Sequence, residues 1–352
     1  MQEGKALIAM SGGVDSSVTA YLMLQAGFDC IGATMHLFDK ETAVGRDADD
    51  ARAVARRLGI PFYVFDFTDC FKKEVIEKFV RCYECGLTPN PCIDCNRCLK
   101  FQALYEQARL LGCDYIATGH YASIRFSSTD GRWLLYKASD KTKDQSYFLY
   151  TLSQEQLSRT RFPLGALTKE SVRDLAQQQG FLNARKRDSQ DICFIPNGDY
   201  VEFLKKYTGK TYASGNFLDM EGRVIGSHQG AVAYTRGQRK GLGLAMGAPV
   251  YVYGKDMEQN TVTVSDNTAL YSRALRANDW NFFPFETLSA PLRVRAKARS
   301  RMTEQPATVY PEENGFCTVE FDEPQRAVTT GQAVVLYDGD QVIGGGTITE
   351  IL

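Results

Sequence analysis

The stretch that decides the fold is KALIAMSGGVDSS, residues 5–17. Residues 5–10, which contain the apolar run Ala6–Met10, have the length of a buried strand. The turn Ser11-Gly12-Gly13 follows, and apolar residues then recur at helical spacing, at Val14, Val18, Tyr21 and Leu22. A buried strand that runs through a glycine-rich turn into an amphipathic helix predicts the first unit of an α/β domain.

The same alternation continues along the first half of the chain. Apolar runs at 30–35, 62–67 and 115–118 predict three more strands. Between these strands, apolar residues recur at helical spacing and predict helices. They are Ala51, Val54, Ala55, Leu58, Phe71, Val75, Phe79, Phe101, Leu104, Ala108 and Leu111. Strands that alternate with helices predict a doubly wound parallel sheet covered on both faces.

The composition changes after about residue 200, which indicates further domains. Glycine, threonine and valine become frequent, and Asp338-Gly339 between two apolar runs is typical of a hairpin. We therefore predict a catalytic α/β domain at 1–205, a small central domain at 206–275 and a β-barrel-like domain at 276–352.

The overall composition restricts the partners. The chain has 352 residues, 41 basic and 42 acidic, so a nucleic acid partner must be met by local basic patches. No apolar run approaches the roughly 20 residues of a membrane helix, and the first residues lack the pattern of a signal peptide. We expect a cytoplasmic protein with no membrane or DNA partner.

Cysteine usage indicates reactive or metal-binding thiols. Of ten cysteines, five fall within the 17 residues of 82–98, and Cys193 lies alone in a polar, basic stretch. In a chain of this size without a signal sequence, such placement favours redox, nucleophilic or metal chemistry over structural disulfides. Three basic residues, Arg185, Lys186 and Arg187, could lower the pKa of Cys193 if the fold brings them near it.

The loop 11–17 has the features of an anion site. Its glycines let the backbone approach a phosphate, and the helix that follows offers N–H groups and a positive dipole end. No Gly-Lys-Ser/Thr follows, so this is not a Walker loop, and it resembles the pyrophosphate-binding (PP) loop of the ATP-pyrophosphatase superfamily. Met35 and Gly119-His120 end other strands at the same sheet edge, where open α/β sheets bind ligands.

Six motifs in order along nearly the whole chain resemble the bacterial tRNA-specific 2-thiouridylase family. They are the loop 11–17, TPNP with Cys92 and Cys95-Asn96 (88–96), TGHY (118–121), KDQSYFL (143–149), DSQDICF (188–194) and GQRKGLG (237–243). The resemblance implies a PP-loop ATPase domain, ATP with Mg²⁺, a tRNA substrate and a persulfide donor such as a cysteine desulfurase or relay protein. The implied product is 2-thiouridine at the wobble position of tRNAs for Lys, Glu and Gln.

The resemblance also assigns site residues. Cys95 matches the nucleophile, and Cys193 matches the cysteine that carries the persulfide. ATP-binding positions are matched by Ala9, Met10, Ser11, Gly12, Gly13, Val14, Asp15, Ser16, Met35 and Gly119. Positions that contact tRNA or the target base are matched by Asn90, Pro91, Cys92, His120, Lys143, Asp144, Gln145, Arg299, Ser300 and Gln332. Ser300 departs from the family pattern, because some relatives carry an aromatic residue there.

These residue types suit the implied chemistry. The C2 carbonyl of uracil is a poor electrophile, and adenylation of its oxygen creates a good leaving group. A persulfide is a strong nucleophile, and a second thiol releases the sulfur by forming a disulfide.

Cys92 occupies a position where the best-studied relatives often carry an acidic residue. Because of this departure, alternatives remain open for the route of sulfur delivery and for the function. With Cys95 and Cys98 it gives overlapping C-x-x-C pairs, and Cys82 and Cys85 give another. Such pairs are typical of zinc or iron–sulfur sites, so a cluster held by Cys92, Cys95 and Cys193 is the alternative sulfur route. Cys82 and Cys98 could equally be small core residues. Two further alternatives are another PP-loop synthetase and a zinc-stabilised RNA-binding module.

A basic stripe in the last domain suggests a phosphate contact independently of the family. Arg293, Arg295, Lys297, Arg299 and Arg301 alternate with small or apolar residues. On one strand, period two would put all five cations on one face, where arginine can bind phosphate bidentately.

Overall fold

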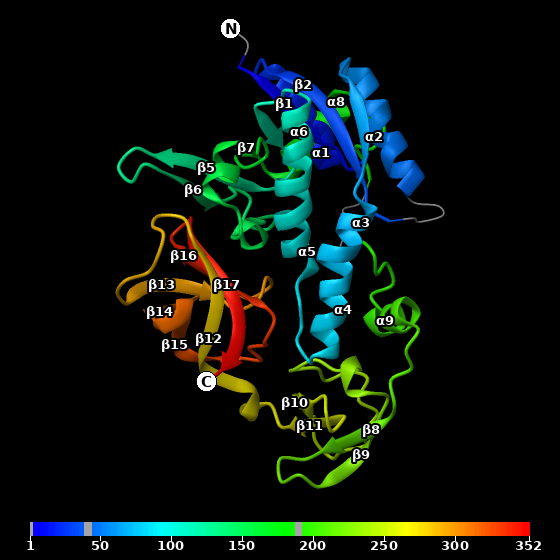
Figure 1. The fold of residues 1–352 in the computed structure, drawn as a ribbon, viewed down its shortest axis with the longest axis vertical. Coiled ribbons are helices and arrows are strands. Elements are labelled where there is room, and N and C mark those ends of the chain that lie inside the picture. The colour runs from blue at the N-terminus through cyan, green and yellow to red at the C-terminus, as the bar shows by residue number, and fades with distance from the viewer. Residues whose placement is uncertain (1–2, 39–43, 187–191) are drawn as a thin grey trace.

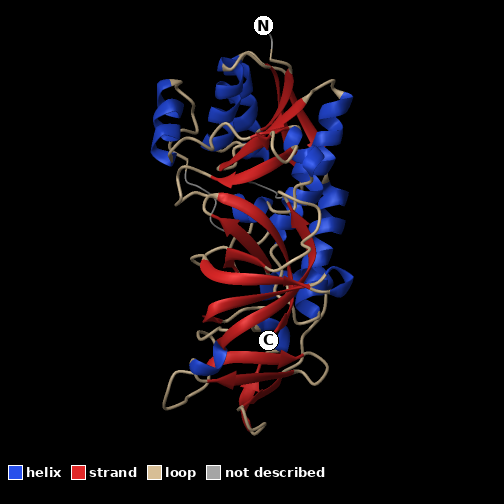
Figure 2. Cartoon of the chain, turned by 90° about the vertical axis from the view of Figure 1, so that its left-hand side faces the viewer, coloured by secondary structure: helices blue, strands red, loops and turns tan. Residues whose placement is uncertain are grey.

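A computed structural model of the chain describes residues 3–38, 44–186 and 192–352. Three units follow one another along the long axis of the molecule, with the N-terminal α/β domain at one end and the small central domain at the other (Figure 1). The C-terminal barrel lies between them, and its strands stack below the first sheet (Figure 2). This arrangement confirms the predicted fold class.

The N-terminal sheet is parallel and has the order β3-β2-β1-β4-β7. Its strands are β1 (Lys5–Ala9), β2 (Asp29–His36), β3 (Phe62–Asp66), β4 (Tyr115–Ala117) and β7 (Thr160–Arg161). The central strand β1 is apolar on both sides, since Ala6 and Ile8 pack into one core cluster and Leu7 into another.

Helices cover both faces of this sheet. One face is covered by α1 (Val14–Gln25), α2 (Val44–Leu58) and α8 (Lys169–Gln178). The other is covered by α3 (Thr68–Phe71), η1 (Lys72–Ile76), α4 (Glu77–Glu84), α5 (Pro91–Asp94), η2 (Cys95–Ala103) and α6 (Leu104–Leu110). Both η1 and η2 are π-helices, a wide form in which residue i bonds i+5 and which is frequent at functional sites.

The first domain also supplies a β-hairpin to the barrel sheet. Strands β5 (Ala122–Ser127) and β6 (Arg132–Lys137) pair with each other, and β6 pairs with β17 of the barrel. Short helices η3 (Ser146–Leu149) and α7 (Gln154–Ser158) follow. The hairpin lies within the predicted first domain, yet it extends the sheet of the last one.

The C-terminal unit is an antiparallel barrel. Its strands are β12 (Tyr271–Phe282), β13 (Leu292–Lys297), β14 (Gln305–Pro311), β15 (Cys317–Arg326), β16 (Ala333–Asp338) and β17 (Gln341–Ile351), with η6 at Glu313–Gly315. The pairing of β12 with β17 closes the barrel. The predicted hairpin at Asp338-Gly339 is confirmed, with Gly339 at φ 56°.

The prediction that five cations share one strand face is wrong beyond Lys297. The strand β13 ends there, so only Arg293, Arg295 and Lys297 of the five lie on the strand. Arg299 and Arg301 lie in the bend that follows, and both are exposed. The stripe is therefore a short strand face continued by a basic loop.

The central unit is a four-stranded sheet of order β10-β11-β8-β9. Its elements are β8 (Gly215–Leu218), β9 (Val224–His228), η4 (Ala231–Ala233), β10 (Tyr251–Asp256), β11 (Thr261–Ser265) and η5 (Thr268–Leu270), and α9 (Tyr200–Thr208) leads into it. Among the described residues, no helix has the length and apolar character that a membrane crossing requires.

A buried ion pair joins the hairpin to the barrel. Lys137 Nζ at the end of β6 lies 2.7 Å from Glu304 just before β14, and the two side chains are 10% and 14% exposed. Because Glu304→Ala leaves a buried ammonium without its carboxylate, we expect a loss of about 3 kcal/mol in the free energy of unfolding. Urea denaturation of the wild type and of Glu304→Ala measures this difference in the free energy of unfolding.

The matched control is Asp340→Ala. Lys141 and Asp340 form an exposed pair of the same length between the same two units. Exposed pairs contribute less than about 1 kcal/mol, so the control should change little. Equal losses in the two variants would contradict a special role for the buried pair.

Candidate active site

The nucleotide loop lies at the topological switch point of the sheet. Since β2 and β4 flank β1 on opposite sides, the loops after β1 and β4 leave the same edge next to each other. Gly119 shows how closely they approach, because a Cβ on Gly119 would lie 3.0 Å from the Asp15 carbonyl carbon and the Ser16 nitrogen. The loop itself is closed by Ser16, whose hydroxyl accepts from Ser11 N at 3.2 Å and donates to Gly13 O at 3.0 Å.

Gly12 has a specific steric reason to be glycine. Its φ is 71°, and a Cβ there would lie 2.3 Å from the carbonyl oxygen of Asp47 in α2. The loop is therefore wedged between α2 and the first turn of α1, with the N–H groups of that turn at the carboxyl edge of the sheet.

A buried lysine, which the sequence analysis did not single out, contacts the loop. Lys169 Nζ lies 2.8 Å from both carboxylate oxygens of Asp15, and the Tyr121 hydroxyl donates to the same carboxylate at 2.9 Å. Lys169 is the first residue of α8, where the helix dipole disfavours a cation. That misfit is the sequence signal that could have identified it.

The segment before Cys193 is attached to the same loop. Asn183 Nδ2 donates to Gly12 O at 3.0 Å and to Ser17 Oγ at 2.9 Å. Lys186 Nζ contacts Gly12 O, and carboxylate oxygens of Asp47 and Asp50 lie 2.7 Å from it.

We expected residues 185–187 to lower the pKa of Cys193 if the fold brought them near it. Lys186 does not support this hypothesis, because its ammonium is paired with Asp47 and Asp50 beside the nucleotide loop. Arg185 is exposed, and Arg187 lies outside the described residues. The first four residues of the DSQDICF motif, 188–191, also lie outside them, whereas Cys193 is described and is exposed.

The cysteine segment begins at the TPNP motif. Asn90 caps α5 through its side-chain oxygen, which accepts from Cys92 N at 3.3 Å, and Pro91 occupies the first helical position. Cys92 is exposed, and Cys95 begins the π-helix η2 as a half-buried residue.

Cys95 and Cys193 lie within electrostatic range of each other although 98 residues separate them. The pKa of Cys95 is raised to about 11, mainly by burial and also by the charges of Cys193, Cys92 and Cys98, against the opposing charge of Lys100. Burial also raises the pKa of Cys92, again against Lys100. The two thiols that the resemblance assigned to sulfur transfer thus lie near enough for their charges to interact.

The barrel holds the TPNP loop from the other side. Thr88 N donates to Thr330 O at 3.0 Å, and Gln332 Nε2 donates to Thr88 O at 2.8 Å. Between these contacts Gly331 approaches the loop, and a Cβ there would lie 2.9 Å from Thr88 N. The contact of Gln332 with tRNA stays a prediction, because its amide here supports the backbone next to Asn90.

The other predicted tRNA-binding residues lie in different environments. The side chain of Asp144 accepts from Ala138 N at 2.9 Å, and that of Gln145 accepts from Tyr121 N at 3.0 Å, so both brace the site from within. Lys143 is half-buried and Ser300 is half-buried near the exposed Arg299.

His120 is buried at 7% exposure and packs between Phe101 and Phe162. A direct contact of His120 with tRNA stays a prediction, since the ring is covered by protein in this structure.

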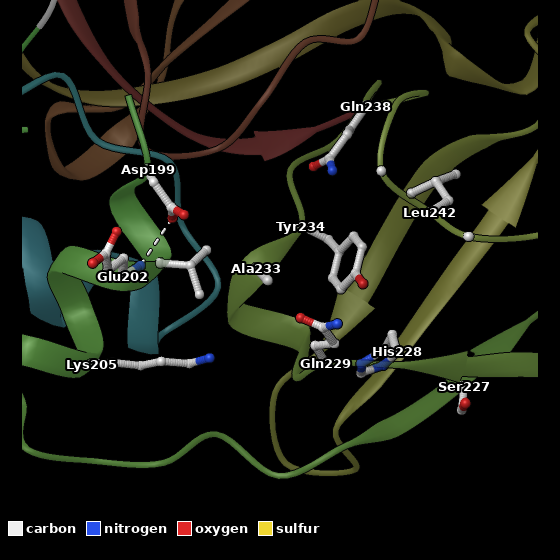
Figure 3. A pocket seen from close by; sticks show the side chains of 13 residues that line it. Asp199, Glu202, Lys205, Ser227, His228, Gln229, Ala233, Tyr234, Gln238 and Leu242 are labelled. Atoms are coloured by element: carbon white, nitrogen blue, oxygen red, sulfur yellow. Dashed lines mark hydrogen bonds between the residues drawn. The ribbon is translucent and has the colours of Figure 1, made fainter. Parts of the chain in front are cut away.

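The linings of two clefts include neither Cys95 nor Cys193. One, of about 590 Å³, opens beyond the ends of β2 and β3 next to Met35 and is lined by His36, Asp66, Phe67, Thr68, Asp69 and Cys70. The other, of about 520 Å³, separates α9 from the central sheet (Figure 3). Gln238, Gly241, Leu242 and Gly243 of the GQRKGLG motif line it, opposite Glu202 and Lys205 of α9.

The C-x-x-C pairs do not build a metal site in the described part of the chain. No three Cys, His, Asp or Glu side chains converge there as a metal ion requires. Cys82 and Cys98 are half-buried, and Cys98 packs against the core, as expected for small core residues.

Comparison with known families agrees with this geometry. The family model described as tRNA methyl transferase HUP domain matches residues 4–197, a tRNA methyl transferase PRC-barrel domain matches 201–266, and an aminomethyltransferase beta-barrel domain matches 272–348. The tRNA-specific 2-thiouridylase MnmA of Acetivibrio thermocellus is 48% identical, over 99% of this chain and 100% of its own length. That of Clostridioides difficile is 46% identical, over 99% of both chains.

Solved structures are more distant. The U34-tRNA thiolase NcsA of Methanococcus maripaludis is 19% identical, with a TM-score of 0.37 over 59% of this chain and 68% of its own. A 4-thiouridine synthetase in complex with RNA and ATP gives the same identity and score, over 58% and 50%. Likeness at this level carries no functional argument.

A PP-loop domain joined to the two further domains that the family models match, in a chain similar over its whole length to these relatives, defines an ATP-using sulfurtransferase of tRNA. The chain belongs to the tRNA-specific 2-thiouridylase family.

The raised pKa of Cys95 has a measurable consequence. The thiolate is the reactive form, so alkylation of Cys95 by iodoacetamide in the folded protein should accelerate up to a pH of about 11. In urea, where burial is lost, the midpoint should fall toward about 8.5, the usual pKa of an exposed cysteine. Mass spectrometry of the peptide containing Cys95 measures both profiles, and a folded-state midpoint below 9 would refute the effect of burial.

Proposed function

We propose that this chain carries out the ATP-dependent 2-thiolation of the wobble uridine in tRNAs for Lys, Glu and Gln, with sulfur delivered by a persulfide on Cys193. The observation that carries the proposal is that Cys193 lies within electrostatic range of Cys95, on a segment that follows the contact of Asn183 with the PP loop. Family membership supports the reaction, and the geometry supports the sulfur route.

The first step is adenylation of the uracil O2. The loop 11–16 binds the ATP phosphates through backbone N–H groups and the N-terminus of α1. Mg²⁺ commonly binds one or two carboxylates together with substrate phosphates, and Asp15 is the carboxylate of the loop that fits this role. When bound, the ion would neutralise phosphate charge, while Lys169 holds the Asp15 carboxylate in place.

The second step transfers sulfur. The terminal sulfur of the Cys193 persulfide attacks C2, the C2–S bond forms, and AMP leaves with the electrons of the C2–O bond. The Cys95 thiolate then attacks the Cys193 sulfur, so that the persulfide S–S bond breaks toward the base and a Cys95–Cys193 disulfide forms. An external thiol reductant returns both cysteines to the reduced form.

The exposure of Cys193 supports loading from outside. A donor protein that carries a persulfide must reach this thiol, and Cys193 is exposed whereas Cys95 is half-buried. This difference in exposure supports a role for Cys193 in receiving sulfur and a role for Cys95 in resolving the persulfide. Both tRNA and such a donor are intracellular partners, so we infer a cytoplasmic location.

The cluster alternative fits the structure less well. A cluster needs its thiolates to converge on one metal group, and Cys92, Cys95 and Cys193 do not form such a group in the described residues. Cys92 lies next to Asn90 and Pro91 and is exposed, which suits a residue that lines the base pocket.

The test of the function and the sulfur route is one experiment with cysteine variants. Nucleosides from tRNA are analysed by mass spectrometry after incubation with ATP, Mg²⁺ and a persulfide donor. Cys95→Ser and Cys193→Ser should each abolish 2-thiouridine, because one thiol delivers sulfur and the other releases it. Cys85→Ser and Cys98→Ser are the controls and should retain activity.

Cys92→Ser separates the two routes. In the persulfide route it should retain appreciable activity, whereas a serine ligand would bind iron poorly. A brown protein with stoichiometric iron and sulfide, inactive as the apoprotein, would overturn the persulfide route while leaving the thiolation of tRNA intact.

The basic loop after β13 gives a prediction on tRNA binding. In the double variant Arg299→Ala/Arg301→Ala, tRNA affinity should depend less on salt. The slope of log affinity against log salt concentration should become shallower by about one unit per lost phosphate contact. Arg293→Ala is the matched control, because the Arg293 guanidinium is already engaged by Asp322. An unchanged slope in the double variant would show that the loop does not contact phosphate.

A further inference from the structure

Lys100 is a half-buried cation of the site for which the described residues provide no acidic partner. Three other lysines of this domain are matched by carboxylates: Lys169 by Asp15, Lys186 by Asp47 and Asp50, and Lys78 by Asp94. Lys100 forms no ion pair with any described carboxylate. Because a partly desolvated ammonium is costly without a counter-charge, such a lysine favours an anion brought by a ligand.

The protein holds this ammonium in place through His120. Lys100 Nζ lies 3.5 Å from His120 Nε2, and His120 Nδ1 lies 2.7 Å from Thr118 Oγ1. An ammonium can only donate, so Nε2 is the acceptor and the proton of the neutral ring is on Nδ1. Burial, and then the charge of Lys100, hold the pKa of His120 well below its usual range, which keeps the ring an acceptor.

The π-helix directs Lys100 to the same side as Cys95. In an α-helix, residues five apart differ by about 140° around the axis, at roughly 3.6 residues per turn. In η2 the bonding of residue i to i+5 brings Cys95 and Lys100 closer to one face. The charge of Lys100 acts on both Cys92 and Cys95, in agreement with that placement.

Lys100 therefore lies between the phosphate loop and the thiols. On one side it contacts His120, and the neighbouring Gly119 abuts Asp15 and Ser16 of the loop. Cys92 and Cys95 lie within range of its charge, and Cys95 begins the π-helix that carries Lys100. In the reaction proposed above, the anionic group that spans these two places is the phosphoryl group that joins AMP to O2 of the base.

We propose that Lys100 is a catalytic residue that contacts the phosphoryl group of the adenylated uridine and stabilises the negative charge on AMP as it leaves. This inference rests on the proposed function and adds a residue to it. As sulfur bonds to C2 and the C2–O bond breaks, the electron pair moves to the departing oxygen, where the Lys100 ammonium offsets it. His120 is the positioning residue that aims Lys100.

The experiment separates the two half-reactions in a single turnover. Pyrophosphate, AMP and 2-thiouridine are measured for the wild type, Lys100→Met and Lys100→Arg with tRNA, ATP, Mg²⁺ and persulfide-loaded protein. Lys100→Met should form pyrophosphate at a rate close to that of the wild type. AMP release and 2-thiouridine should both slow by about 100-fold, the usual effect of removing one charge-stabilising donor, so adenylated tRNA accumulates.

The controls address folding and general charge. Lys100→Arg keeps the cation and should recover much of the rate, which a purely structural role for the lysine would not explain. Lys73→Met makes the same substitution at an exposed lysine in the other π-helix and should behave as wild type. His120→Phe should show the Lys100→Met pattern in weaker form, with pyrophosphate formation retained.

Several outcomes would overturn the assignment. Pyrophosphate formation that slows as much as thiolation would place Lys100 in ATP or tRNA binding. AMP release at the wild-type rate without thiolation would make Lys100 a partner of the thiols only. Wild-type rates in Lys100→Met would refute any role. If the wild type itself forms no pyrophosphate with tRNA, the proposed function fails, and the role of Lys100 fails with it.

Discussion

The parallel pairing of β1 with β2 on one side and β4 on the other is the constraint on which the site depends. Because the strand order reverses at β1, the loops on either side leave the sheet without covering each other. The loop 11–13 and the segment 118–121 occupy that opening. The register is fixed by burial on both faces of β1, so a shift by one residue would exchange Leu7 with its neighbours between two cores.

The rest of the chain braces this edge from three directions. Residues 183–186 return to the loop through Asn183 and Lys186, and so carry the Cys193 segment to it. The helix that begins at Cys95 contacts the core through Asn96, whose side-chain amide donates to Phe148 O at 3.0 Å. It contacts the barrel through Arg97, whose guanidinium lies 3.0 Å from the carboxylate of Asp279. Catalytic groups on loops and helix ends are thus held by rigid elements.

Much of the fold was predictable because its signals are local. The strand–turn–helix of residues 5–25 and the hairpin at Asp338-Gly339 depend on neighbouring residues, and both are as predicted. The prediction of a five-residue basic strand face was wrong beyond Lys297. A strand continues only while neighbouring strands pair with it, and β14 and β16 stop pairing with β13 at this point. Residue alternation cannot show where a partner ends.

The unpredicted parts of the site depend on contacts between distant residues. Gln332 reaches Thr88 across 244 positions, and Lys169 reaches Asp15 across 154. The π-helix at Cys95 was not predicted, because Phe101 within it and Leu104 and Ala108 just beyond it keep ordinary helical spacing. Nothing in the local pattern of apolar residues marks the wide turn that sets the direction of Lys100.

The hairpin β5–β6 gives the barrel an unusual folding history. Residue 341, where β17 begins, is synthesised 204 residues after residue 137, where β6 ends. At the usual rates of synthesis that interval is about 10 to 40 s, during which the edge of β6 has no strand to pair with. An unpaired edge is a template for aggregation, so the nascent chain depends on the charges of Arg132 and Lys137, and on early packing by α7, to protect it.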